Sequence, residues 1–179
     1  KGDGIEIDLG VDFVRSELSD GFNWNTNINF SKSKQIVTEQ GDDQIIYAGS
    51  TNAVLGGNAA IEGEQLGVIV GTRIKRDADG NLLVGGNGNY LSESNIVLED
   101  GRSITPIIGD PNPDFVMNYT NTFEYKGFSL GFAINHTSGG DIYSTTTATL
   151  MGRGLTTDTE DRLSTYILPG VNINTGLPN

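Results

Sequence analysis

Apolar and polar side chains alternate along four stretches of the chain, a period of two that is typical of β-strands with one apolar face. Apolar residues occupy the odd positions of residues 5–13 and, apart from Thr26, the even positions of residues 22–31. The same alternation recurs in 115–125 and 128–137. Because short polar turns join the first stretch to the second and the third to the fourth, the pattern predicts two β-hairpins.

The segment between the hairpins, residues 35–114, has a less regular pattern. Residues 67–75 are a moderate strand candidate, and residues 82–91, beyond a polar turn at 77–81, are a poor one. The pattern alone therefore predicts at most two further strands in this segment.

The stretches that flank the second hairpin are expected to lack regular strands. Residues 110–114 are predicted to form a stiff turn, because each of their two prolines fixes its own φ and restricts the preceding residue. Residues 139–179 are polar, rich in Thr and Gly and without clear periodicity, so we expect a long loop with at most a short element at 166–168.

Composition and charge exclude several classes of function. The 179 residues carry 23 acidic and 11 basic side chains, a net charge of −12, which argues against a nucleic-acid partner because phosphate binding needs clustered Lys and Arg. The absence of cysteine excludes disulfides, thiolate metal sites and a cysteine nucleophile. His136 is the single histidine, which excludes a multi-histidine metal site, and we expect neither a metal nor a cofactor.

Transmembrane helices are also excluded, because no run of about 18 apolar residues exists. A transmembrane strand stays possible, since it needs only about 9–11 residues with one apolar face. Residues 1–4 lack the apolar segment of a signal peptide, so we expect the chain to begin inside a longer protein.

Two architectures produce this alternation. In a soluble β-sandwich the apolar face is buried against a second sheet, whereas in an outer-membrane β-barrel it meets lipid and the polar face lines the lumen. Alternation alone does not separate them. Three features favour the barrel: strands longer than the usual soluble length, aromatic residues at the strand ends, and short turns that alternate with much longer loops.

The number of strands indicates that the chain is a segment of such a barrel. Roughly five or six strands are recognisable, whereas the smallest bacterial barrels have about eight, and an open edge in lipid leaves backbone groups unpaired. If both hairpin turns are periplasmic, an even number of strands has to separate the hairpins. The sequence offers one good candidate, 67–75, and one poor one, 82–91.

A series of short motifs runs in order through most of the chain. The motifs are Lys1–Ile7, Phe22–Ser31, Glu62–Gly71, Gly109–Phe115, Asn121–Leu130 and Gly139–Ser144. The fifth, with the sequence NTFEYKGFSL, is the most specific. Together they resemble the C-terminal part of the barrel of SusC/RagA-type TonB-linked outer-membrane proteins of the Bacteroidetes.

The resemblance implies an importer of the outer membrane and not an enzyme. Such proteins are 22-stranded antiparallel transmembrane β-barrels, occluded by a plug, with long extracellular loops. A SusD-like surface lipoprotein captures a glycan or peptide substrate and closes over the barrel, and TonB opens a path by acting on the N-terminal region. On this basis residues 1–179 are a segment of the β-barrel domain, without the plug domain, the TonB box and the final strands.

The polar face of the first hairpin is the candidate substrate-binding surface. Amides and carboxylates there can hydrogen-bond a hydrated sugar or peptide, although such groups equally line any wet wall. The candidates that would face the lumen are Asn23, Asn25, Asn27 and Asn29, together with Glu6, Asp8 and Asp12.

Other motifs are interpreted as structural. Asp77–Asn81 begins like a calcium loop, but Leu82 and Gly88 stand where such a loop needs Gly and Glu, so a solvated turn is favoured. His136 is expected on the apolar face near the rim. Residues 85–88 are glycine-rich but do not join a clear strand to a helix, so they are not a phosphate-binding loop.

Two alternatives to the importer remain open. The first is a soluble, secreted β-sandwich that binds glycans or surfaces, which would need a dry core between two sheets. The second is an extracellular β-rich hydrolase, which would need acid and base carboxylates on rigid strands. The acidic cluster Asp158, Glu160 and Asp161 lies in an expected loop, and we interpret it as a solvated charge cluster.

Overall fold

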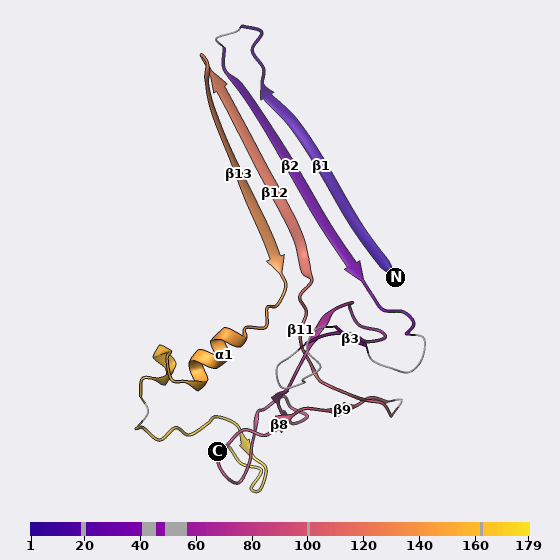
Figure 1. Cartoon of the computed structure of the whole chain (residues 1–179), viewed down its shortest axis with the longest axis vertical. Coiled ribbons are helices and arrows are strands. Elements are labelled where there is room, and N and C mark those ends of the chain that lie inside the picture. Colours follow the sequence, from indigo (N-terminus) through magenta and orange to yellow (C-terminus); the bar gives the residue numbers. More distant parts are fainter. Residues whose placement is uncertain (19–20, 41–45, 49–56, 100, 162) are drawn as a thin grey trace.

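Four long strands form an antiparallel sheet that dominates the computed structural model (Figure 1). The structure describes residues 1–18, 21–40, 46–48, 57–99, 101–161 and 163–179. The strands are β1 (Gly2–Val14), β2 (Asn23–Gln35), β12 (Pro113–Tyr125) and β13 (Phe128–Gly139), in the spatial order β1-β2-β12-β13. Both predicted hairpins are therefore confirmed, and so is the all-β antiparallel class. Among the described residues, no strand pairs with the outer edge of β1 or β13.

Both hairpin turns lie at the same end of the sheet, which we term the turn end (Figure 1). Lys126 and Gly127 both have positive φ, 49° and 80°, as a two-residue turn requires when its twist matches that of the strands. Gly127 tolerates this conformation because it has no Cβ. In the first turn the Gly21 amide donates to the Leu18 carbonyl, while residues 19–20 lie outside the described part.

Strands β2 and β12 pair directly, although the segment between them is long. In this pairing Thr26 lies opposite Asn121 and Asn29 lies opposite Asn118. We refer to the opposite end of the sheet as the loop end (Figure 1); the described residues of 36–112 and 140–179 extend from it. No strand of the described residues stands between β2 and β12, so neither candidate strand of the intervening segment, 67–75 or 82–91, belongs to the long sheet.

Short strands replace the expected wall strands in residues 36–112, the segment that we term the excursion. Residues 67–75 form β5 (Val68–Val70) and β6 (Arg73–Ile74), and β7 covers only Leu83–Val84. One small sheet has the order β11-β5-β4-β3, with β3 at Ile46–Ala48, β4 at Gly57–Ala60 and β11 at Ile107–Gly109. The other short strands are β8 (Ser92–Glu93), β9 (Ile96–Val97), β10 (Ser103–Ile104) and β14 (Val171–Asn172).

The apolar core of the described residues lies in the excursion and not on the long sheet. Its central cluster consists of Ala59, Ile61, Val68, Val70 and Ile104, each at most 3% exposed. Burial of these side chains stabilises strands that are individually too short to persist. The excursion therefore folds around its own small core beside the loop end.

The predicted stiff turn at 110–114 is confirmed only for its first half, because Pro113 and Asp114 already belong to β12. Residues 110–112 connect several segments at the loop end. One oxygen of Asp110 accepts from the amide of Asn112 at 2.9 Å, and the other accepts from the Gln65 side chain. Asp141, which follows β13, accepts from the Asp110 amide at 2.8 Å, and its own amide donates to the Asp110 carbonyl. These bonds connect the start of β12 to the end of β13 and to the excursion.

The C-terminal segment contains a helix that periodicity did not predict. Helix α1 (Thr145–Gly152) is capped by Ser144, whose hydroxyl accepts from the Thr147 amide, and η1 (Thr157–Thr159) follows it. None of the α1 residues is buried, so its sequence carries no apolar stripe to reveal it. Residues 166–168 form no element, which the expectation of at most a short one there allowed. The elements that it missed are α1, η1 and the short strand at Val171–Asn172.

Candidate functional site: the two faces of the long sheet

The apolar face of the long sheet is open. Its side chains on the outer strands are between 44% and 81% exposed: Ile5, Ile7, Leu9 and Phe13 of β1, and Phe128, Leu130, Phe132 and Ile134 of β13. Within the four strands the only buried residues are Thr26 and Asn121, and both are polar. An uncovered apolar face of this size is a surface for lipid or for another protein.

Aromatic side chains cross the apolar face near the turn end. Phe13 contacts Trp24 with ring centroids 4.5 Å apart, Trp24 contacts Phe123 at 5.6 Å, and Phe123 contacts Phe132 at 6.1 Å. Phe22 extends the group, 6.3 Å from Phe123. These five residues form the aromatic belt, which spans all four strands.

A smaller aromatic group lies on the same face near the loop end. Phe115 stands between Phe30 and His136, at centroid distances of 5.5 and 5.6 Å. His136 therefore lies on the apolar face near the rim, as predicted. The apolar face is bounded by aromatic rings at both ends.

The opposite face is polar and carries a ladder of amide–carboxylate hydrogen bonds between β1 and β2. The amide nitrogens of Asn25 and Asn27 donate to Asp12 at 2.7 Å and to Asp8 at 2.9 Å, and Asn29 donates to the second oxygen of Asp8 at 3.5 Å. We term these five residues the Asn–Asp ladder. The bonds fix the ladder's amides, and each asparagine keeps its oxygen for a further donor.

The four candidate asparagines share this polar face, as the alternation predicted. Asn23 differs from the others, because its side-chain oxygen accepts from the Ser16 amide at 2.7 Å and so fixes the first turn. Glu6 lies opposite Ser31 at the other end of the ladder. Whether any of these residues binds substrate remains a prediction.

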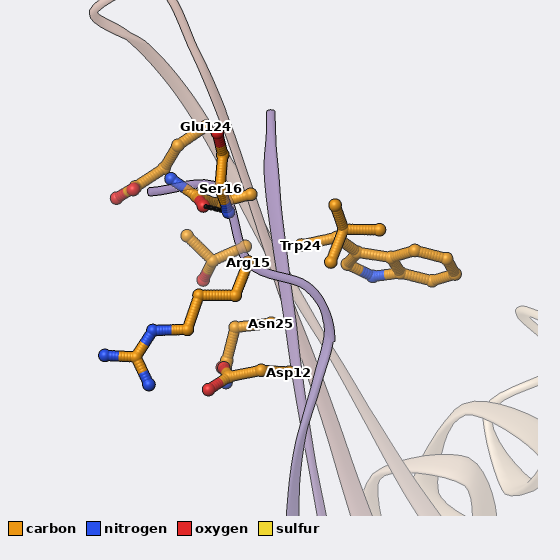
Figure 2. A pocket seen from close by; sticks show the side chains of 9 residues that line it. Asp12, Arg15, Ser16, Trp24, Asn25 and Glu124 are labelled. Atoms are coloured by element: carbon orange, nitrogen blue, oxygen red, sulfur yellow. Dashed lines mark hydrogen bonds between the residues drawn. The ribbon is translucent and has the colours of Figure 1, made fainter. Parts of the chain in front are cut away.

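A pocket of about 460 Å³ opens on the polar face at the turn end. Asp12, Arg15, Asn25 and Glu124 point to one side of the strands, while the indole ring of Trp24 points to the other (Figure 2). The carboxylates of Asp12 and Glu124 and the guanidinium of Arg15 thus line one open pocket. Sequence reasoning missed Arg15 and Glu124, because Arg15 follows the end of the periodic run and Glu124 is an ordinary polar position of a strand.

Residues 77–81, which resemble the start of a calcium-binding loop, form a turn in which the Asp77 carboxylate is hydrogen-bonded within the turn itself. One carboxylate oxygen of Asp77 accepts from the amides of Asp79 and Asn81, and the other accepts from the Asn81 side chain. Among the described residues, no group of three or more His, Asp or Glu side chains is placed to hold a metal ion. These hydrogen bonds, chiefly those from Asn81, lower the pKa of Asp77 below its usual 3.8.

We expect the turn at 77–81 to loosen in acid. Because the pKa of Asp77 is lowered in the folded chain, its contribution is present above pH 3.8 and is lost as the pH falls through the folded value. At neutral pH, Asp77→Ala should raise hydrogen–deuterium exchange of the Asn81 amide by about tenfold, and Asp79→Ala should not. Equal exchange in the two variants at neutral pH would contradict this role for Asp77.

The acidic cluster of the C-terminal segment is solvated, as expected. Asp158, Glu160 and Asp161 are all exposed. Asp161 accepts from the hydroxyl and the amide of Ser164, and these bonds lower its pKa. The cluster provides no pair of carboxylates on rigid strands, which the hydrolase alternative needs.

Among the described residues, no helix is long and apolar enough to cross a membrane, a finding that says nothing about strands. No family model matches the sequence.

Three curated proteins of Formosa agariphila are similar to most of the chain. The chain is 28% identical to TonB-dependent receptor P3 over 177 residues, which cover 92% of this chain and 17% of that protein. It is 23% identical to TonB-dependent receptor P26 over 160 residues, covering 79% of this chain and 15% of that protein. For TonB-dependent receptor P39 the identity is 24% over 184 residues, covering 78% of this chain and 17% of that protein.

These similarities indicate weak homology to TonB-dependent receptors over most of the chain. The chain spans only about a sixth of the length of these relatives. TonB-dependent receptors are proteins of the outer membrane, which agrees with the predicted localisation.

Proposed function

We propose that the long sheet is part of the wall of a closed β-barrel in a TonB-dependent importer. The apolar face meets lipid, and the polar face, with the Asn–Asp ladder, lines a water-filled lumen. The observation that carries this proposal is the pair of unlike faces: one is apolar and exposed, and the other is polar and hydrogen-bonded. The unpaired edges of β1 and β13 then join further strands of a 22-stranded barrel, because lipid tolerates no open edge.

The spacing of the aromatic groups fits a membrane. Phe115 and Phe123 of β12 belong to the loop-end group and the aromatic belt respectively. Their separation along the strand is about 27 Å at about 3.4 Å per residue. A tilt of about 40° reduces this to about 21 Å along the membrane normal, comparable to the apolar band of about 25 Å between aromatic girdles.

The two ends of the sheet give the orientation of the barrel. Turns on the periplasmic side of such barrels are short and extracellular loops are long. We therefore assign the turn end to the periplasmic side. The described residues of the excursion and of 140–179 lie at the other end (Figure 1), which we assign to the extracellular rim.

The soluble β-sandwich is the less favoured function. It requires a second sheet over the apolar face of the first. Among the described residues, the buried apolar side chains lie in the excursion and none lies on the long sheet. A chain folded in this way would present its apolar face to water, which is costly for a soluble protein.

Within the TonB-dependent receptors, we assign the protein to the SusC/RagA group. Its partner is then a SusD-like lipoprotein and its substrate a glycan or peptide. TonB acts through the N-terminal region of the whole protein. Support for a protein partner comes from the loop end, where large apolar side chains are exposed: Ile142, Leu155, Leu163, Tyr166 and Ile167. The Asn–Asp ladder supports a hydroxyl- or amide-rich substrate, because its free amide oxygens accept hydrogen bonds from such groups.

Uptake by cells with and without the full-length protein tests the importer function. Labelled neutral oligosaccharides and peptides should enter cells that carry the protein, and entry should stop when a protonophore collapses the proton gradient. Binding at the cell surface should persist under the protonophore. Unchanged uptake of the whole panel after deletion of the gene would contradict the proposal.

Charge on the loop-end apolar surface should weaken capture of the lipoprotein. Ile142 and Leu163 are 91% and 98% exposed, so replacing both with aspartate removes no internal packing. We expect about tenfold less lipoprotein to copurify with the full-length double variant, because apolar anchors dominate such interfaces. Asp158→Asn, on the same segment, is the matched control and should leave copurification unchanged. Undiminished copurification with the double variant would exclude this surface as the docking site.

A further inference from the structure

Asn121 of β12 is the most deeply buried polar residue of the long sheet, 1% exposed, although it lies on the apolar face. Its side-chain oxygen accepts three hydrogen bonds, from the Trp24 indole at 3.0 Å, the Thr26 hydroxyl at 2.8 Å and the Tyr119 hydroxyl at 3.1 Å. Trp24 and Thr26 belong to β2, so two of these bonds cross between strands. We term these four residues the Asn121 network.

The orientation of the Asn121 amide is fixed by its neighbours. The indole N–H of Trp24 can only donate, so the atom that faces it has to be the amide oxygen. The amide nitrogen is then buried without a partner. A buried, partly satisfied amide tolerates little rearrangement, because further loss of partners is costly away from water.

The network lies between β2 and β12, the pair of neighbouring strands whose register is not set by a short turn. We term this boundary the seam. Short turns fix the pairing of β1 with β2 and of β12 with β13, because loop length determines the register of a hairpin. The excursion that joins β2 to β12 is too long for its length alone to do so. A direct link between the two strand ends runs through Leu66 at the loop end, whose amide donates to the Gln35 carbonyl and whose carbonyl accepts from the Asn112 side chain. Among the described residues, the side-chain hydrogen bonds that connect β2 to β12 both end on the Asn121 oxygen.

The alternation of apolar and polar residues does not prevent every error in the register between β2 and β12. A slip of one residue turns every side chain to the wrong face and is excluded by the pattern. A slip of two residues keeps the apolar residues on one face and the polar residues on the other. It would move Asn121 from its place opposite Thr26 to a place opposite Ile28 in one direction, or Trp24 in the other.

We propose that Asn121 is a positioning residue that selects the register of β2 against β12. The proposal rests on the two hydrogen bonds from β2 that end on the buried Asn121 oxygen. They lie between the two strands that no short turn connects. A buried polar group that specifies register at some expense of stability has precedent in coiled coils. The inference concerns assembly of the sheet, so it stands whether or not the protein is an importer.

Disulfide formation can measure this register in the full-length protein once any cysteine outside residues 1–179 is replaced by serine, because residues 1–179 contain none. Asn29→Cys with Asn118→Cys places two thiols opposite each other in the observed register. Asn27→Cys or Ser31→Cys, each with Asn118→Cys, reports a slip of two residues. Opposite Cβ atoms lie about 5 Å apart and diagonal ones about 7 Å, so oxidation to a disulfide distinguishes them.

In the protein with the Asn121 network intact, the 29–118 cysteine pair should form a disulfide far more readily than the 27–118 and 31–118 pairs. With Asn121→Leu we expect the ratio of the 29–118 product to the slipped products to fall by about tenfold, because two cross-strand bonds are lost. Asn135→Leu makes the same replacement on β13, opposite Asn118 and outside the network, and should leave the ratio unchanged. An unchanged ratio with Asn121→Leu would overturn the proposal.

A second variant separates register selection from simple stabilisation and serves if Asn121→Leu does not assemble. Trp24→Phe, Thr26→Val, Tyr119→Phe and Asn121→Leu together leave no unpaired polar group in the network. We expect this variant to assemble into a barrel with heat-modifiable electrophoretic mobility, yet to give slipped products. Restoration of the 29–118 disulfide as the main product would show that the network only stabilises the sheet.

Discussion

Ile134→Arg is expected to destabilise the assembled barrel by about 2–4 kcal/mol, the loss typical of a cation at the lipid-facing midplane of a barrel. Ile134 lies on the apolar face in the middle of β13 and is 54% exposed. If that face met water, the same replacement would change stability by no more than about 0.5 kcal/mol. Equilibrium unfolding of the full-length protein by urea in lipid vesicles measures the difference.

The control for this prediction is the adjacent residue. Ala133 is exposed on the polar face, so Ala133→Arg introduces the same charge on the same strand toward the lumen. It should change stability little. Equal effects of the two arginines, whether both small or both large, would contradict the assignment of the two faces.

Val70→Asp should open the excursion and leave the long sheet assembled. Val70 is 2% exposed at the centre of the excursion core, and an unpaired buried carboxylate costs about 3–5 kcal/mol. We expect proteolysis within residues 57–107 to accelerate roughly hundredfold, since cleavage follows the population of the opened state. Limited proteolysis followed by mass spectrometry of the fragments measures this rate.

Val97→Asp is the matched control, because Val97 is 74% exposed on the same segment and should tolerate the charge. The heat-modifiable mobility of the barrel should be the same in both variants. Loss of that mobility in Val70→Asp would show instead that the excursion and the wall fold as one unit.

The four long strands could be predicted because two local signals agreed: the alternation with a period of two, and the short turns between the alternating stretches. The residues at which the strands end could not be predicted. Strand β2 continues to Gln35 through Lys32 and Lys34, positions that continue its apolar face with charged side chains. Pairing with the first residues of β1 extends the strand there, so cross-strand bonds override the local pattern.

The direct pairing of β2 with β12 was hidden from the sequence for a physical reason. Strands of two to four residues, such as β5 and β6, are too short to show a period of two reliably. The excursion core depends on contacts between residues as distant as Ala59 and Ile104. A segment that offers one good and one poor candidate for a wall strand therefore folds as a separate small unit.

The candidate site was predicted in part. The alternation placed the asparagines of β2 on one face, but their hydrogen bonds to Asp8 and Asp12 required the register of β1. Thr26 and Asn121 are visible in the sequence as single interruptions of an apolar face. Only the pairing of β2 with β12 brings these two interruptions opposite each other.

The measurement that tests the central claim most directly is spin-label accessibility along β13 in the full-length protein in lipid bilayers. Single cysteines would replace residues 129–136 in turn and carry a nitroxide. We predict a period of two, with oxygen, which concentrates in lipid, reaching positions 130, 132 and 134, and a water-soluble nickel complex reaching positions 129, 131, 133 and 135. If the even positions are instead inaccessible to both reagents, a second protein layer covers the apolar face, and the sheet is not the wall of a membrane barrel.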